Sequence, residues 1–451
     1  MADNPIAKIF RIKELRSRIF YTIGMLLIFR IGAMIPVPGI DPSALATYLE
    51  SLKGEAVTGL AGMLDFFSGG AFSRVSVLML GVMPYISMQI IMQLLLLVFP
   101  SLKKISEEDG GRKKIQKYNR YGTVILCIVE SAMILSQVRR IEAHMGEGGS
   151  IRFDGFYGSG EWLFVIFSMI SLTAGTMFLV WMGEQITARG IGNGISLLIF
   201  AGIVARMPEA VVEVIRSMGP GKSVDIIDFI IVMAVFVVVV GLVIYEQQGQ
   251  RKIPVHYAKR VVGRKMYGGQ NVYFPIKLNP SGVIPIIFAS SIMQMGATIA
   301  DFISRRFGSP IPASLQYGGI WFVIIEVILI IFFAFFYTQV TFNPPEIAKQ
   351  IRENGGSIPG IRIDKTEEYL AKILNRIIFP GSLFLALIVL IPEIVVRVFG
   401  FPMNFAMLMG GTSLMIMVGV DLDTMGQIEG FLKMHHQDGI VKKGKIRSRN
   451  L

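Results

Sequence analysis

Residues 81–93 read GVMPYISMQIIMQ, and residues 282–294 read GVIPIIFASSIMQ. Both stretches share the pattern G-V-x-P-x-I followed by I-M-Q, at a constant offset of 201 residues. One interpretation is a chance match among apolar residues, and the other is an internal repeat. The second is favoured because each copy falls in the second apolar span of one half of the chain.

The composition of the whole chain, which contains this repeated motif (the echo), is that of a membrane protein. Of 451 residues, 53% are hydrophobic and 17% are charged, and the mean hydropathy is +0.59. Water-soluble domains carry about 25% charged residues, and several apolar runs here are long enough to cross a hydrocarbon core of about 30 Å. The chain is therefore predicted to be an all-α polytopic membrane protein, which excludes a soluble enzyme, a disordered chain and a fibrous protein.

Hydropathy predicts ten transmembrane helices, most of them close to the length that a bilayer requires. The predicted spans are 19–35, 75–99, 121–138, 162–182, 191–205, 226–245, 283–299, 320–340, 377–398 and 405–420. Pro84 and Pro285 lie inside the two echoed spans, and we expect each proline to bend its helix.

Lysine and arginine predict the orientation, because cytoplasmic loops are enriched in both. With the N-terminus inside, the inside segments carry 32 of these residues, the outside segments carry 10, and Arg30 and Arg397 lie within spans. Both termini are therefore expected to be cytoplasmic. Five spans per half is an odd number, so the two halves are predicted to be inverted relative to each other.

The predicted domains follow from these spans. They are a cytoplasmic segment (1–18), an N-terminal half (19–205), an external linker (206–225), a C-terminal half (226–425) and a basic cytoplasmic tail (426–451).

The predicted spans contain few polar or ionisable side chains. Away from the ends of the spans, their charged residues are Arg30, Glu130 and Glu326, each expected to pair with a neighbouring helix or a partner subunit. Gln89, Gln93 and Gln294 are candidates for hydrogen bonds between helices. A solute carrier needs polar groups at the midplane, and a membrane-embedded enzyme needs a nucleophile or metal cluster; neither pattern is found. The sequence GPGKS at 219–223 lacks the earlier glycine of a phosphate loop, and no cofactor or metal is expected.

Two kinds of segment outside the spans have alternative interpretations. Residues 58–70 are apolar but too short to span, so they form either an interfacial helix or a re-entrant helix buried in protein. The basic inside segments 101–120, 246–279 and 343–376 either set topology and attract anionic lipid or dock a large cytoplasmic partner.

Several motifs, in order and with matching spacing, resemble the SecY family, the pore subunits of the bacterial protein-conducting channel. They are FRIG (29–32), FSGGA (67–71), MPYIS (83–87), GEQIT (183–187), GIGNGIS (190–196), VIP (283–285), PGIR (359–362) and GGTS (410–413). The resemblance covers essentially the whole chain.

The resemblance implies a passive channel for unfolded polypeptides in the bacterial cytoplasmic membrane, with a lateral gate that releases apolar segments into lipid. It implies two inverted five-helix halves, no enzymatic activity, and SecE, SecG, SecA and the ribosome as partners. Signal sequences, unfolded polypeptides and membrane lipids are the other molecules that such a channel meets.

The resemblance also assigns residues. The pore ring falls on Val82, Ile86, Ile195, Ile199, Ile287 and Ile416, with Val82 in place of a commoner isoleucine. The plug, at about 58–74, includes Leu60, Met63, Leu64, Phe66, Phe67, Gly69 and Gly70. The lateral gate is assigned to Gln89, Gln93, Glu130 and Gln294, and docking of SecA or the ribosome to Arg251, Lys252 and Arg362 in loops 246–279 and 343–376. The alternative for Arg362 is an ion pair within its loop, with Glu353 or Asp364.

Overall fold

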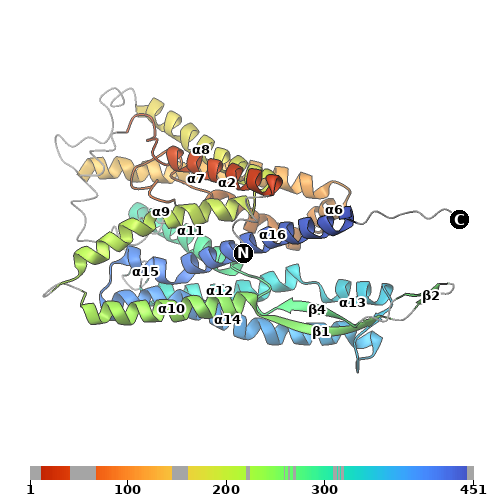
Figure 1. Ribbon diagram of the computed structural model, residues 1–451. Coiled ribbons are helices and arrows are strands. Elements are labelled where there is room, and N and C mark those ends of the chain that lie inside the picture. The colour runs from red at the N-terminus through yellow and green to blue at the C-terminus, as the bar shows by residue number, and fades with distance from the viewer. Residues whose placement is uncertain are drawn as a thin grey trace. The chain divides into compact units, whose positions relative to one another are not determined.

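The computed structural model describes residues 12–40, 65, 68–144, 161–219, 224–257, 260–262, 265–267, 271–307, 312, 315 and 319–443. The chain is mostly helical, as predicted, and it divides into two compact units (Figure 1). Unit 1 comprises residues 1–210 and 419–451, and unit 2 comprises residues 211–418. The two predicted halves remain a proposal.

Unit 1 is a helical bundle. Its helices are α2 (Lys13–Gly32), α5 (Met83–Val98), α6 (Pro100–Glu107), α7 (Gly111–His144) and α8 (Glu161–Arg189), with most of α9 (Gly194–Ser217) and the C-terminal part of α16 (Gly411–Lys443). α7 packs on both α5 and α8, and α2 packs on α8. The buried side chains of Val75, Met79, Cys127, Phe164 and Leu172 belong to one apolar core between these elements.

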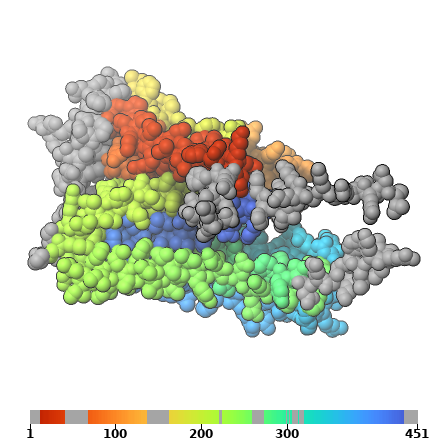
Figure 2. Space-filling view, in the orientation of Figure 1, coloured from red at the N-terminus to blue at the C-terminus, as the bar shows by residue number. Residues whose placement is uncertain are grey.

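Unit 2 is helical with a small sheet at one end (Figure 1). Its helices are α10 (Ile226–Gln248), α11 (Ile284–Phe307), α12 (Ile320–Thr341), α13 (Pro344–Glu353), the 3₁₀ turn η4 (Ile363–Lys365), α14 (Thr366–Phe399) and α15 (Met403–Met409). α12 packs between α11 and α14, and α13, α10 and α15 pack on α14. Figure 2 shows α10 uncovered along its length on this face of unit 2, as expected for a helix that contacts lipid.

The strands of unit 2 were not predicted. β1 (Gln250–Tyr257) pairs antiparallel with β4 (Asn271–Lys277) and with the short β5 (Gly356–Ser357), while β2 (Arg260–Val262) pairs with β3 (Lys265–Tyr267). Ile253, Val255 and Ile276 point into an apolar core that is completed by Ile351 of α13 and Leu370 of α14. The alternation of apolar and polar residues in β1 is the period-2 signal of a strand, and sequence reasoning missed it because the segment was interpreted by its charge.

Each of the ten predicted spans overlaps a described helix. Among the described residues, five helices are long and apolar enough to cross a membrane, and the number becomes seven if each bent helix pair counts as one span. One bent pair is α5 with α6, which meet at 105°, and the other is α15 with α16, which meet at 42°. The count of ten and the inverted arrangement therefore remain predictions.

Candidate functional site

The echoed motif adopts the same local structure in both copies. Gly81 and Gly282 have φ angles of +60° and +59°. Their N–H groups donate to the carbonyl oxygens three residues earlier, of Leu78 at 2.9 Å and Asn279 at 3.3 Å. In each copy a helix begins two residues after the glycine, at Met83 or at Ile284. The repeat is thus a turn with a left-handed glycine that starts a helix.

The predicted bends at the two prolines are wrong. Pro84 and Pro285 are the second residues of α5 and α11, where a helix has no hydrogen bond for a backbone N–H to make. Proline is favoured in this first turn, because its φ angle already suits a helix. The prolines therefore start the two helices and do not bend them.

The other two helices that carry predicted ring residues also begin beside glycines in the left-handed region. α9 begins at Gly194, two residues after Gly192 with φ +82°, and α16 begins at Gly411 with φ +63°. The six predicted ring residues lie within the first two turns of their helices or, for Val82, at the N-cap of α5. A glycine in the left-handed region therefore lies at or just before the start of each helix that carries these six aliphatic side chains.

The loop before α9 is held by polar contacts within unit 1. Thr22 of α2 accepts a hydrogen bond from the Ile191 N–H at 3.1 Å, and Gln427 Oε1 of α16 accepts one from the Gly192 N–H at 2.8 Å. A Cβ atom on Gly194 would lie 2.0 Å from the backbone oxygen of Gly183 in α8. The start of α9 is therefore fixed by close backbone packing as well as by hydrogen bonds.

Burial of the predicted ring residues is high. Val82, Ile86, Ile199 and Ile416 are at most 7% exposed, and Ile195 and Ile287 are partly exposed. Val82, Ile86, Ile195 and Ile199 belong to unit 1, whereas Ile287 and Ile416 belong to unit 2. The ring as a closed set remains a prediction.

Of the predicted plug residues, Gly69 and Gly70 are described, while Leu60, Met63, Leu64, Phe66 and Phe67 lie outside the described residues. Gly69 and Gly70 have φ angles of +68° and +87°. Arg30 of α2 donates from Nη1 to the Gly69 carbonyl oxygen at 2.8 Å. Arg30 therefore contacts this loop, and its pairing with a neighbouring helix or a partner subunit stays a prediction.

Sequence reasoning missed two charged residues beside this loop. The Asp65 carboxylate forms an ion pair with Arg206 of α9, and both side chains are largely buried, with 10% and 19% exposed. A signal was present, because Asp65 is the one acidic residue of 58–74 and Arg206 directly follows the fifth predicted span.

The predicted gate residues lie on helices in both units. Gln89 donates from Nε2 to the Tyr85 hydroxyl at 3.2 Å within α5. We predicted a hydrogen bond between helices for Gln89, whereas this one lies within a single helix. Gln93 of α5 and Glu130 of α7 lie on helices that pack against each other. Gln294 lies on α11, and its side chain is outside the described set.

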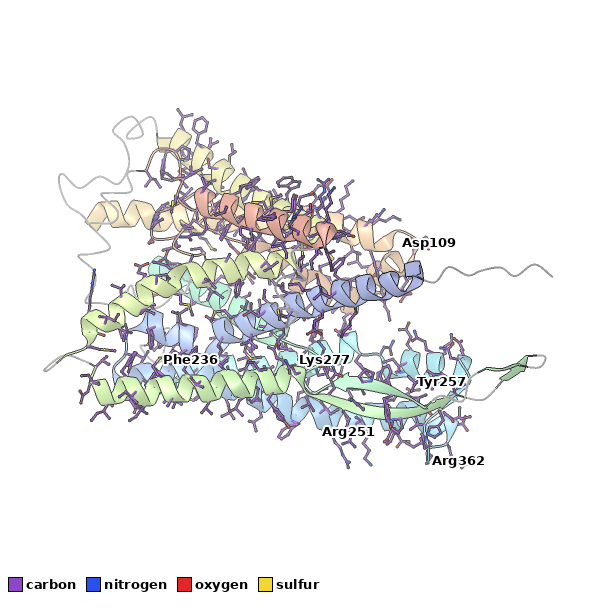
Figure 3. All side chains as sticks on the ribbon, in the orientation of Figure 1. Asp109, Phe236, Arg251, Tyr257, Lys277 and Arg362 are labelled. Carbon is purple, nitrogen blue, oxygen red and sulfur yellow. The ribbon has the colours of Figure 1, made fainter. Side chains whose placement is uncertain are left out.

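The predicted docking residues are exposed at the sheet end of unit 2. Arg251 and Lys252 lie on β1, and Arg362 directly precedes η4 (Figure 3). Glu353 pairs with Lys349 at 3.8 Å, and among the described residues no carboxylate forms an ion pair with Arg362. The three cations are therefore available to an acidic partner or to phosphate.

Comparison with known proteins identifies the family. The SecY family model matches residues 76–425. The chain is 41% identical to the protein translocase subunit SecY of Aquifex aeolicus, over 96% of this chain and 98% of the relative. It is also 41% identical to the subunit of the same name from Escherichia coli K12, over 96% and 95% of the two chains.

Solved structures support the same fold. A structure described as that of a protein conducting channel matches with a TM-score of 0.59 at 19% identity, over 94% of this chain and 96% of the other. Sec61 in the canine ribosome-channel complex from the endoplasmic reticulum matches with a TM-score of 0.56 at 19% identity, over 94% and 96%. The family comprises channel subunits and not enzymes, and this membrane-embedded chain belongs to it: it is a member of the SecY family of protein translocase subunits.

Proposed function

We propose that this translocase subunit is a passive channel that passes unfolded polypeptides through a ring of aliphatic side chains. The observation that carries the proposal is the placement of Val82, Ile86, Ile195, Ile199, Ile287 and Ile416 directly after four glycine turns. A narrow aliphatic constriction dewets and so resists ions without a charged gate. Aliphatic side chains also select no particular peptide sequence, which suits a channel for many substrates.

The plug and the lateral gate complete this proposal. The segment at about 58–74 closes the resting channel, and Arg30 donates a hydrogen bond to the carbonyl oxygen of Gly69 within it. Gln89, Gln93, Glu130 and Gln294 line the gate through which apolar segments leave for lipid. Whether a segment leaves through the gate depends on its partition between the channel and lipid. Each Leu or Ile favours lipid by about 0.3–0.6 kcal/mol, and a charged residue at the centre of the segment disfavours it by about 2.5–3.5 kcal/mol.

Partners on the cytoplasmic side are proposed from charge and exposure. Arg251 and Lys252 are exposed cations on the sheet, and Arg362 is an exposed cation in the segment before η4, which suits SecA or ribosomal RNA. The structurally similar Sec61 was solved in a ribosome-channel complex. SecE and SecG are proposed as the companion subunits, and signal sequences as the segments that open the gate.

The proposed location is the bacterial cytoplasmic membrane, with both termini in the cytoplasm. The charge distribution supports this orientation, because 32 lysine and arginine residues lie in the inside segments and 10 in the outside segments. Ten spans in two inverted halves, 19–205 and 226–425, joined by an external linker at 206–225, fit the same orientation.

Ion leakage through the resting channel tests the ring. Ile86→Ser and Ile287→Ser should each raise the conductance of the purified channel in planar bilayers, because a hydroxyl lets water wet the constriction. Ile230→Ser is the matched control, since Ile230 is 62% exposed on α10. Equal conductance in all three variants and in the unmodified channel would contradict the proposal.

A further inference from the structure

The last turn of α10 lies against the segments from which two other helices of unit 2 begin. Gln247 donates from Nε2 to the carbonyl oxygen of Met415, near the start of α16, at 3.4 Å. Glu246 is 7% exposed, and its side chain lies beside the amide of Asn279, in the turn that precedes α11. One turn of one helix is therefore in contact with the starts of α11 and α16.

The backbone also joins the end of α10 to the turn before α11. β1 follows directly from α10 (Figure 1), and beyond the last pair of the β1–β4 ladder the Gly249 carbonyl oxygen accepts from the Leu278 N–H at 2.8 Å. A Cβ atom on Gly381 of α14 would lie 3.2 Å from the Leu278 carbonyl oxygen, so α14 closely approaches the same backbone. Leu278 is thus held on two sides, and it directly precedes Asn279.

Asn279 closes the turn before α11 with its side chain. Its Nδ2 atom donates to the Gly282 carbonyl oxygen at 3.0 Å, and its Oδ1 atom accepts from the Ser281 hydroxyl at 2.8 Å. Asn279 and Ser281 are only 6% and 4% exposed. Removing one partner of such a bond leaves a buried polar group unsatisfied, which costs stability.

This polar closure belongs to one copy of the echoed motif alone. At the offset of 201 residues, Asn279 and Ser281 correspond to Leu78 and Leu80 in the first copy. A leucine side chain has no group that forms a hydrogen bond. The turn before α11 therefore has a polar side-chain clamp that the turn before α5 lacks.

Both anchored segments carry proposed ring residues of unit 2. Ile287 lies in the first turn of α11, where its N–H donates to the Val283 carbonyl oxygen at 3.3 Å. Ile416 directly follows Met415 and is 4% exposed. A shift of either helix start would therefore move a ring residue.

We propose that Gln247 and Asn279 are positioning residues that hold the starts of α16 and α11 against the last turn of α10, and so set the positions of Ile416 and Ile287. This inference rests on the proposed role of these two isoleucines in the ring. It adds the contacts that place them.

Hydrogen exchange of the assembled channel in lipid nanodiscs measures how firmly each helix start is held. Asn279→Ala removes both side-chain hydrogen bonds of the turn. The amides of residues 283–289 should then exchange about tenfold faster, which corresponds to about 1.4 kcal/mol of lost local stability. Gln247→Met nearly keeps the shape of the side chain but removes the donor, so the amides of residues 411–418 should exchange about threefold faster, a smaller change because this hydrogen bond is long.

Matched variants separate these contacts from a general loss of structure. Gln247→Lys keeps a donor and should exchange as the parent does. Ser281→Ala removes one of the two bonds and should have a smaller effect than Asn279→Ala. Gln248→Met and Asn354→Ala make the same chemical changes at exposed positions and should leave exchange at both helix starts unchanged.

Resting ion leakage of the same variants separates this inference from the proposed function. Faster exchange with higher leakage supports both. Faster exchange with normal leakage supports the positioning of the two helices and contradicts the role of Ile287 and Ile416 in the seal. Unchanged exchange at either helix start in its own variant, or an equal increase in α12, overturns the positioning proposal whatever the leakage, and Ile287→Ser then tests the ring by itself.

Discussion

Substituting alanine for Gly81 or Gly282 tests whether the repeated turn fixes the ring-bearing helices. Both glycines have φ angles close to +60°, and a Cβ atom at either position would meet no other atom within 4 Å. The cost is therefore backbone strain alone, about 1–2 kcal/mol for an L-residue in the left-handed region. We expect each variant to lose this amount of unfolding free energy in mixed detergent micelles.

The two losses should add to about 2–4 kcal/mol in the double variant, because the glycines lie in different units and share no contacting atom. Asparagine tolerates the left-handed region better than alanine, so Gly81→Asn should fall between the parent and Gly81→Ala. Because α5 and α11 begin two residues later, both alanine variants should also raise resting ion leakage.

Gly24→Ala and Gly241→Ala are the matched controls. These glycines lie inside α2 and α10, and a Cβ atom there would also meet nothing within 4 Å. Alanine favours a helix over glycine by about 0.8–1.0 kcal/mol, so both controls should be neutral or stabilising. If Gly81→Ala and Gly282→Ala behaved like these controls, the left-handed turn would not be what starts the two helices.

Three further predictions address the surroundings of the site. Thr22→Val leaves the Ile191 N–H without its hydrogen-bond acceptor and should lower the unfolding free energy by about 1–3 kcal/mol. Thr22→Ser keeps the hydroxyl and should have the stability of the parent. An equal loss in both variants would show that the hydrogen bond is not the cause. Ile253→Ala removes a side chain that is 2% exposed in the sheet core, so the sheet should lose about 2–5 kcal/mol of stability. SecA-driven transport should weaken although no cation is changed. If hydrogen exchange showed a loosened sheet while transport stayed normal, docking would not need the sheet. Arg362→Glu should weaken SecA-driven transport while leaving assembly intact, Arg362→Lys should weaken it less, and normal transport by Arg362→Glu would exclude Arg362 as a docking contact.

The sequence by itself determined the class of this protein, while the site residues that it predicts remain predictions. Hydropathy placed the ten apolar segments on helices, because the length and apolar content of a span are local properties that a bilayer requires of each segment separately. The repeat at 81–93 and 282–294 could be found in the sequence because a turn that starts a helix is formed by consecutive residues.

Only the tertiary structure decided which residues meet. Asp65 and Arg206 are 141 residues apart in the chain. Each residue stands out within its own segment, but no local pattern shows that folding brings the two together. The sheet around Ile253 likewise needs α13 and α14 to cover it, so its stability comes from packing between distant segments and not from the composition of its own loop.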